Sequence, residues 1–232
     1  MTTQRFDWVG TIVKPAVFTA ALVPLAALAW NFFHDRLSAN PIADITNATG
    51  IWTLRFLVIT LAITPARKLA KLSWLSRFRR MTGVFAFFYA ALHFTTYIWL
   101  DKFFEWQEMF DDVAKRKFIA IGFASFVLLI PLALTSFNKA QKWLGGKRWN
   151  ALHRLTYLIG IGGVVHFIWR VKADLREPTI YAVVVGVLLL LRLWWLIAQT
   201  RWFSHAGQRK PLQSSQTSPS ASQSFSNPVV RL

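Results

Sequence analysis

The sequence of 232 residues contains no cysteine. Disulfides, thiolate metal sites and iron–sulfur clusters are therefore excluded, and histidine is the only good transition-metal ligand left. Acidic residues are also scarce, with 10 Asp and Glu against 27 Lys and Arg. No Walker motif is present, and the GIGG run at 160–163 lies inside an apolar segment, so it is not a phosphate loop. Any nucleotide chemistry is expected on another protein.

Long apolar segments, by contrast, are abundant. Hydrophobic residues make up 54% of the chain, including 12 Trp and 20 Phe. A helix needs about 20 apolar residues to cross a bilayer core of about 30 Å. Six segments meet this length, and they predict an all-α integral membrane bundle: about 12–32, 48–64, 81–100, 117–135, 149–169 and 178–198. The first run is too long for a cleavable signal peptide and lacks a small-residue cleavage site.

The net charge of +17 is distributed as a topology signal rather than as a nucleic-acid surface. The connections 65–80 and 136–148 hold six and four Lys/Arg and no acid, whereas 101–117 holds five acids. Short basic loops stay in the cytoplasm. We therefore expect both termini to be cytoplasmic and nine of the ten acids to lie outside. The excess positive charge is also expected to attract anionic lipid. Binding of nucleic acid is not expected.

The chain is expected to form one membrane domain, residues 1–204, followed by a tail. Residues 205–232 are rich in Ser, Gln and Pro, a composition that cannot bury a core. The sequence therefore predicts a disordered cytoplasmic tail.

Three of the five histidines lie inside predicted membrane helices, where ionisable side chains are costly and tend to be functional. His93 lies about 10 Å and His166 about 6 Å from the outer ends of their helices, at 1.5 Å per residue. Two neutral imidazoles at similar depth on different helices can hold a haem iron or another metal from both sides. The alternative is a pair of buried histidines that hydrogen-bond across helices. The other two histidines, His34 and His205, are expected to be solvated.

Neighbouring residues are compatible with a haem. Gly162 and Gly163 precede His166 by one helical turn, where missing side chains leave room for a flat macrocycle. Close packing of small residues between helices would explain them equally well. Arg55 lies in the same layer, where it could pair with a haem propionate or extend to the outer headgroups.

His153 lies near the cytoplasmic end of the same helix as His166. Thirteen residues leave the two side chains roughly 140° apart on an ideal helix. They do not share a face unless the helix bends, for example at the glycines. A histidine partner for His153 on the third helix is lacking, because Arg79 and Arg80 occupy those positions.

Two motifs resemble a known family. The runs RRMTGVFAFFYAALHFTTYIWLD (79–101) and GKRWNALHRLTYLIGIGGVVHFIW (146–169) are similar to those of the MsrQ family, formerly YedZ. These proteins are haem-binding membrane subunits of the bacterial periplasmic methionine-sulfoxide reductase system, within the ferric-reductase-like transmembrane superfamily. The resemblance extends through ALAWNFF and LAITP and covers about residues 10–200.

The resemblance implies a b-type cytochrome subunit in the bacterial inner membrane, with b-type haem held by His93, His153 and His166. Electrons would pass from the quinone pool or a cytoplasmic flavin reductase to a periplasmic molybdopterin subunit, which reduces methionine sulfoxide in oxidised proteins. FMN is also associated with the family, but no residue here can be assigned to it. Whether the chain itself counts as an enzyme stays open, because the catalytic step is expected on the partner.

The chain departs from the family's oxidase relatives, which carry two histidines on each of two helices and stack two haems. Here Arg79 and Arg80 stand where the fourth histidine would be. One haem between His93 and His166 is therefore expected, and a second cofactor at His153 stays open. Two other functions also stay open: a stand-alone ferric or oxygen reductase, and a cofactor-free proton-coupled transporter.

Overall fold

The computed structural model describes residues 7–171 and 173–206, the last eight by their backbone only. Six helical segments in this part of the chain are long and apolar enough to cross a membrane, as predicted. They are Val9–Phe33, Pro41–Leu69, Ser73–Asp101, Lys117–Leu134, Asn138–Arg170 and Arg176–Ala198. No strand occurs among the described residues, so the all-α membrane class is confirmed.

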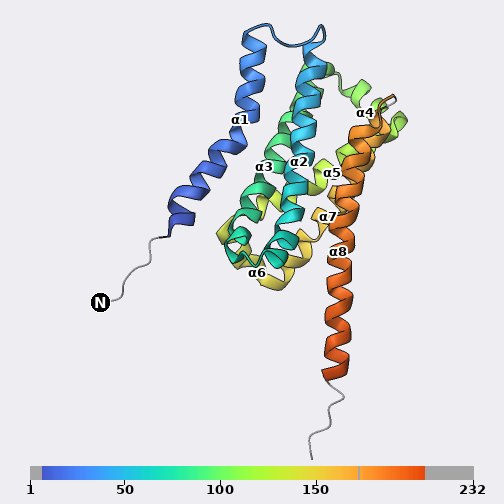
Figure 1. Cartoon of the computed structure of the whole chain (residues 1–232). Coiled ribbons are helices and arrows are strands. Elements are labelled where there is room, and N and C mark those ends of the chain that lie inside the picture. Colours follow the sequence, from blue (N-terminus) through green and yellow to red (C-terminus); the bar gives the residue numbers. More distant parts are fainter. Residues whose placement is uncertain (1–6, 172, 207–232) are drawn as a thin grey trace, which may run out of the picture. The chain divides into compact units, whose positions relative to one another are not determined.

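The helices run back and forth between two ends of the bundle (Figure 1). Helices α1 (Lys14–Phe33), α2 (Pro41–Leu69) and α3 (Arg79–Thr95) are followed by α5 (Lys117–Leu134), α7 (Leu155–Arg170) and α8 (Arg176–Ala206). The most extensive packing joins α2 to α3 and α5 to α7. One end carries the basic α2–α3 connection together with α6 (Asn138–His153), and the other carries α4 (Trp106–Lys115).

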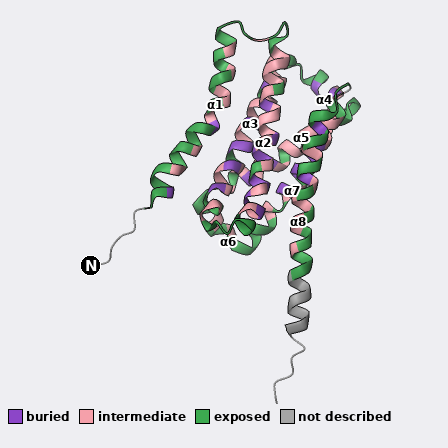
Figure 2. Cartoon of the chain, in the orientation of Figure 1, coloured by how far each residue is buried: buried purple, intermediate pink, exposed green. Residues whose placement is uncertain are grey.

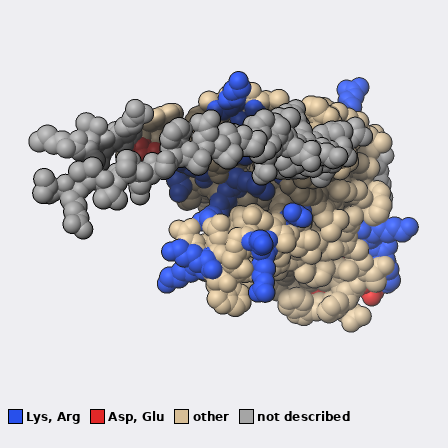
Figure 3. Space-filling view, turned by 90° about the horizontal axis from the view of Figure 1, so that it is seen from below, with Lys and Arg blue, Asp and Glu red and all other residues tan. Residues whose placement is uncertain are grey.

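Lys and Arg gather at the end that carries α6 (Figure 3). Acidic side chains are sparse on this face, because the connections 65–80 and 136–148 contain no Asp or Glu. This end of the bundle is thus basic, as the two basic connections predict. Which end faces the cytoplasm stays a prediction from the sequence.

Aromatic and aliphatic side chains of α2, α3 and α7 form the core, whereas α1 is mostly exposed (Figure 2). Phe56 of α2 stacks on Phe85 and Tyr89 of α3, with ring centroids 5.5 and 5.3 Å apart. The Tyr89 hydroxyl donates a hydrogen bond of 2.8 Å to the carbonyl of Ala21 in α1. Offset aromatic pairs add stability beyond burial alone, so this cluster fixes α2 against α3.

Two helices were not predicted as such. The outer connection 101–117 contains α4, and the basic connection 136–148 is largely helical as part of α6. Gly145 interrupts α6 with φ 73° and ψ 154°, a conformation that glycine adopts readily. Both segments are polar and short, so apolar run length did not reveal them.

Two helix boundaries also differ from the prediction. The second span begins at Pro41 rather than near 48, because Asn40 caps it: its side-chain oxygen accepts a hydrogen bond of 3.1 Å from the Ala43 amide. Within the predicted span 149–169 the helix is interrupted at Arg154, where the backbone forms i→i+3 hydrogen bonds. Residues 160–163 are regular helix, so no bend at the glycines brings His153 and His166 onto one face.

The contacts divide the chain after Leu193, so the last part of α8 is a separate unit, Trp194–Leu232. Its described residues, as far as Ala206, are helical. The predicted tail lies outside the described residues, except for its first two positions.

Candidate functional site

His93 of α3 and His166 of α7 face each other across the bundle. Their ring centroids are 6.1 Å apart and their planes are nearly perpendicular, at 84°. The proximity expected from their similar depth is therefore present. Both side chains are only partly exposed, and they come from two helices that α2 and α5 flank.

Each of these imidazoles is held by a backbone carbonyl of a third helix. His93 Nδ1 lies 2.9 Å from the Thr46 carbonyl oxygen, and His166 Nδ1 lies 2.7 Å from the Phe118 carbonyl oxygen. A carbonyl oxygen can only accept, so Nδ1 carries the proton in both rings. The lone pair of Nε2 is then left for another partner, the arrangement found in metal-binding histidines.

Two glycines make room for the rings, and sequence reasoning missed both. A Cβ at Gly50 would lie 3.0 Å from His93 Cε1, and a Cβ at Gly122 would lie 2.6 Å from His166 Nδ1. Real Cβ atoms do not approach ring atoms as closely as the second value. Gly50 follows Thr46 by four residues, and Gly122 follows Phe118 by four. Each glycine thus lies one turn beyond the carbonyl that holds its histidine.

Two arginines belong to helices that surround the pair, Arg170 of α7 and Arg55 of α2. Arg170, four residues after His166 and so on the same helical face, is close enough to act electrostatically on both rings. Its guanidinium donates to the Asn47 side-chain oxygen. Arg55 donates from Nε to the Tyr181 hydroxyl at 3.1 Å and covers the Trp52 ring at 4.6 Å. Sequence reasoning proposed Arg55 but missed Arg170, which the i, i+4 spacing could have revealed.

Gly162 and Gly163 lie against neighbouring helices. A Cβ at Gly162 would be 2.3 Å from Ser125 Oγ of α5, and one at Gly163 would be 3.5 Å from the Leu54 side chain of α2. Both contacts are helix packing through small residues, the alternative that the sequence left open. A role for these glycines beside a macrocycle stays a prediction.

His153 has surroundings unlike those of the other two histidines. Its Nδ1 lies 3.0 Å from the carbonyl of Trp149 in its own helix, and its ring stacks on the Trp149 ring at 3.9 Å. Its Nε2 is buried and has no hydrogen-bond partner among the described residues. Arg79 and Arg80 of α3 are its charged neighbours, as the missing fourth histidine suggested.

The pair of imidazoles fits a metal held from two opposite sides. Two metal–imidazole bonds of about 2.0 Å, with half of each ring added, span roughly 6 Å. The 6.1 Å between the centroids matches that length. No group of three or more metal-ligating side chains exists in the described part of the chain, so a protein-only metal cage is not available there. A metal that brings its own equatorial ligands, as haem iron does, needs only two axial nitrogens.

Comparison with known proteins agrees with this chemistry. Residues 49–164 match the family described as ferric reductase like transmembrane component. This segment contains His93 and His153 and ends two residues before His166. No solved structure matches the chain.

Several related proteins carry the name protein-methionine-sulfoxide reductase heme-binding subunit MsrQ. The protein of Herminiimonas arsenicoxydans is 54% identical over 187 residues, which cover 80% of this chain and 86% of the relative. That of Ralstonia nicotianae is 46% identical over 87% of this chain and 94% of its own length. That of Xanthomonas campestris is 47% identical over 78% and 85%. With these identities across most of both chains, the protein belongs to the MsrQ family of ferric-reductase-like transmembrane proteins.

Proposed function

We propose that the chain is a b-type cytochrome subunit that passes electrons through the membrane to a methionine sulfoxide reductase. The observation that carries this proposal is the His93–His166 pair at 6.1 Å, with both Nδ1 atoms bonded to carbonyl oxygens. The relatives are named as heme-binding subunits, which supports the same ligand. A bound haem would supply one-electron chemistry at its iron.

In this proposal the Nε2 atoms of His93 and His166 would hold the haem iron. The carbonyls of Thr46 and Phe118 fix the tautomer and the orientation of each ring, and they make each imidazole a stronger donor. Arg170 is the cation placed to pair with a propionate, because it is close to both rings. Arg55 would serve the same purpose after releasing Tyr181.

We propose that the basic end of the bundle and both termini face the cytoplasm. The membrane would be the bacterial inner membrane. Electrons would enter from the quinone pool or from a cytoplasmic flavin reductase. They would leave at the opposite end, which carries α4 and is closer to His93 and His166. FMN stays an expectation from family resemblance without an assigned residue.

The outer connection 101–117 is proposed as the docking surface for a periplasmic molybdopterin subunit. Asp112 is buried and bonds Lys102 at 2.9 Å and Arg116 at 3.1 Å. Burial tends to raise the pKa of Asp112, but the hydrogen bond and charge of Lys102 hold this pKa below its usual value. The same hydrogen bond raises the pKa of Lys102. These ion pairs hold Lys102 and Arg116 against Asp112. Glu105 and its neighbour Trp106 are exposed.

A second cofactor is proposed as an option at His153. Its buried Nε2 without a partner supports a ligand role, since buried polar atoms are normally hydrogen-bonded. Arg79 and Arg80 would then have to supply contacts to anionic groups rather than a second axial bond. A haem-to-polypeptide ratio of two, falling to one in His153→Ala, would support this second site; a ratio of one in the unmodified protein would exclude a second haem.

The experiment that tests the function is reoxidation of the reduced protein. Dithionite-reduced protein is expected to be reoxidised by methionine sulfoxide only when the molybdopterin reductase is present. The rate should fall with added salt if acidic side chains steer docking. Glu105→Lys should slow the reaction, whereas the matched change Asp174→Lys, at another exposed acid of the same end, should not.

Two other outcomes would favour the alternatives. Equally fast reoxidation by oxygen or ferric iron without the partner would indicate a stand-alone reductase. Protein that binds no haem when haem supply is adequate would leave the proton-coupled transporter as the better reading.

A further inference from the structure

A groove of about 550 Å³ lies between α1, the short helix η2 (Ser73–Phe78) and α3. Its volume is within the range of small-molecule sites, about 300–1,000 Å³. None of its lining residues is among those that contact His93 or His166. It is therefore separate from the electron-transfer site.

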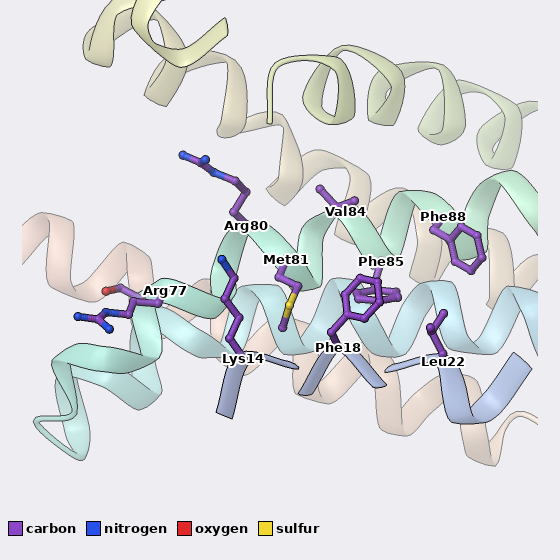
Figure 4. Close-up of a pocket in the computed structure, with 10 residues that line it drawn as sticks. Lys14, Phe18, Leu22, Arg77, Arg80, Met81, Val84, Phe85 and Phe88 are labelled. Carbon is purple, nitrogen blue, oxygen red and sulfur yellow. The ribbon is translucent and has the colours of Figure 1, made fainter. Parts of the chain in front are cut away.

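One end of the groove is cationic. Lys14, Arg77 and Arg80 line it, and Figure 4 places them together at the end nearer η2. Lys14 takes part in no ion pair within the described chain. Arg80 donates to the neutral side chains of Asn138 and Gln141, which leave its charge uncompensated. Arg77 pairs with Asp7 at 2.6 Å.

The other end is aromatic and lies along membrane-spanning helices. Phe18 of α1 contacts Phe85 of α3 with centroids 5.2 Å apart, and Phe85 contacts Phe88 edge to face at 6.3 Å. Phe18 is half exposed and Val84 is 41% exposed, so the groove is open along its length. Arg80 and Phe88 are eight residues apart on α3, about 12 Å, which is within half of a 30 Å hydrocarbon core.

The groove lies along α1, the helix with little buried surface. Within α1 only Ala21 is buried, so this helix packs less closely against the bundle than the central helices do. A molecule lying in the groove would contact α1 and α3 together. An occupant must therefore offer both a negative head and an apolar chain.

We propose that the groove binds one anionic phospholipid, with its phosphate between Lys14, Arg77 and Arg80 and an acyl chain along Phe18, Phe85 and Phe88. Basic pockets between membrane helices recognise anionic headgroups in this way. A zwitterionic lipid lacks the net charge, and a quinol lacks a charged head. The lipid would fasten α1 to the bundle, a role beyond electron transfer.

Native mass spectrometry of the full chain, released from micelles with equimolar phosphatidylglycerol and phosphatidylcholine, tests this. One phosphatidylglycerol should be retained in preference. Lys14→Gln should lower its retention roughly fivefold, because each basic residue at a headgroup contributes about that factor. Val84→Trp should also lower retention by filling the groove without changing charge.

Matched controls are available at exposed sites outside the groove. Lys142→Gln removes another cation of the basic end, and Val127→Trp adds bulk to a lipid-facing valine of α5. Both should retain the lipid. Circular dichroism and gel filtration of each variant exclude misfolding as the cause of any loss.

Several outcomes would overturn the proposal. They are equal retention of the two lipids, an equal loss in Lys142→Gln, and no loss in either groove variant. Displacement of the lipid by millimolar inorganic phosphate would show a site for the free anion instead. Retention of a quinone that Lys14→Glu leaves unchanged would show an apolar site.

Discussion

Protein carrying His93→Ala or His166→Ala is expected to lose most of its haem absorbance. Each substitution removes one of the two proposed ligand nitrogens. The remaining ring cannot shift to replace it, because its Nδ1 is bonded to a carbonyl. Loss of an axial ligand should weaken haem binding by more than the roughly 10–100-fold that loss of an outer-shell partner costs. Absorbance spectra of purified protein, normalised to polypeptide, measure the effect.

His34→Ala is the matched control for this loss. His34 is exposed, stacks on Trp30 at 3.8 Å and bonds the Trp30 carbonyl at 2.9 Å, so it lies outside the proposed site. Its variant should keep the full spectrum. If both His93→Ala and His166→Ala kept it too, the ligand assignment would be wrong.

The second large effect on haem binding is expected from Gly122→Ala, which adds one methyl group to α5. In Gly122→Ala the new Cβ would lie 2.6 Å from His166 Nδ1, so the ring must move and lose its bond to Phe118. Haem binding should weaken at least about tenfold, as for other losses of an outer-shell partner. Titration of haem into the apoprotein measures this affinity.

A graded series makes this prediction specific. Gly50→Ala, with its Cβ 3.0 Å from His93 Cε1, should have a smaller effect, because the contact is less severe. Gly186→Ala meets nothing within 4 Å and should have none. All three replacements favour the helix itself by about 1 kcal/mol. Equal haem affinity across the three variants would contradict a role for the two glycines in seating the rings.

The parts of the fold that depend on apolar length were predictable from the sequence. The six spans and the equal depth of His93 and His166 follow from run length and helical rise, which are properties of single segments. The partners of the rings were not predictable in this way. Thr46, Phe118 and the glycines beside them lie 40 residues or more from the histidines in sequence, and only helix packing brings them together.

The missed helices have a different cause. α4 and α6 are too polar to show as apolar runs, and their start depends on local turns. The turn at Arg154, between α6 and α7, likewise depends on backbone hydrogen bonds that apolar run length does not reveal. Arg170 could have been found, since it follows His166 by one helical turn.

Electron paramagnetic resonance of the oxidised protein tests the central claim most directly, because the signal reports both axial ligands and their relative orientation. Two imidazoles with planes 84° apart should give a low-spin ferric signal of the highly anisotropic type that perpendicular rings produce. One such haem per polypeptide is the predicted result. A high-spin signal, or no haem in protein made with adequate haem supply, would contradict ligation by His93 and His166.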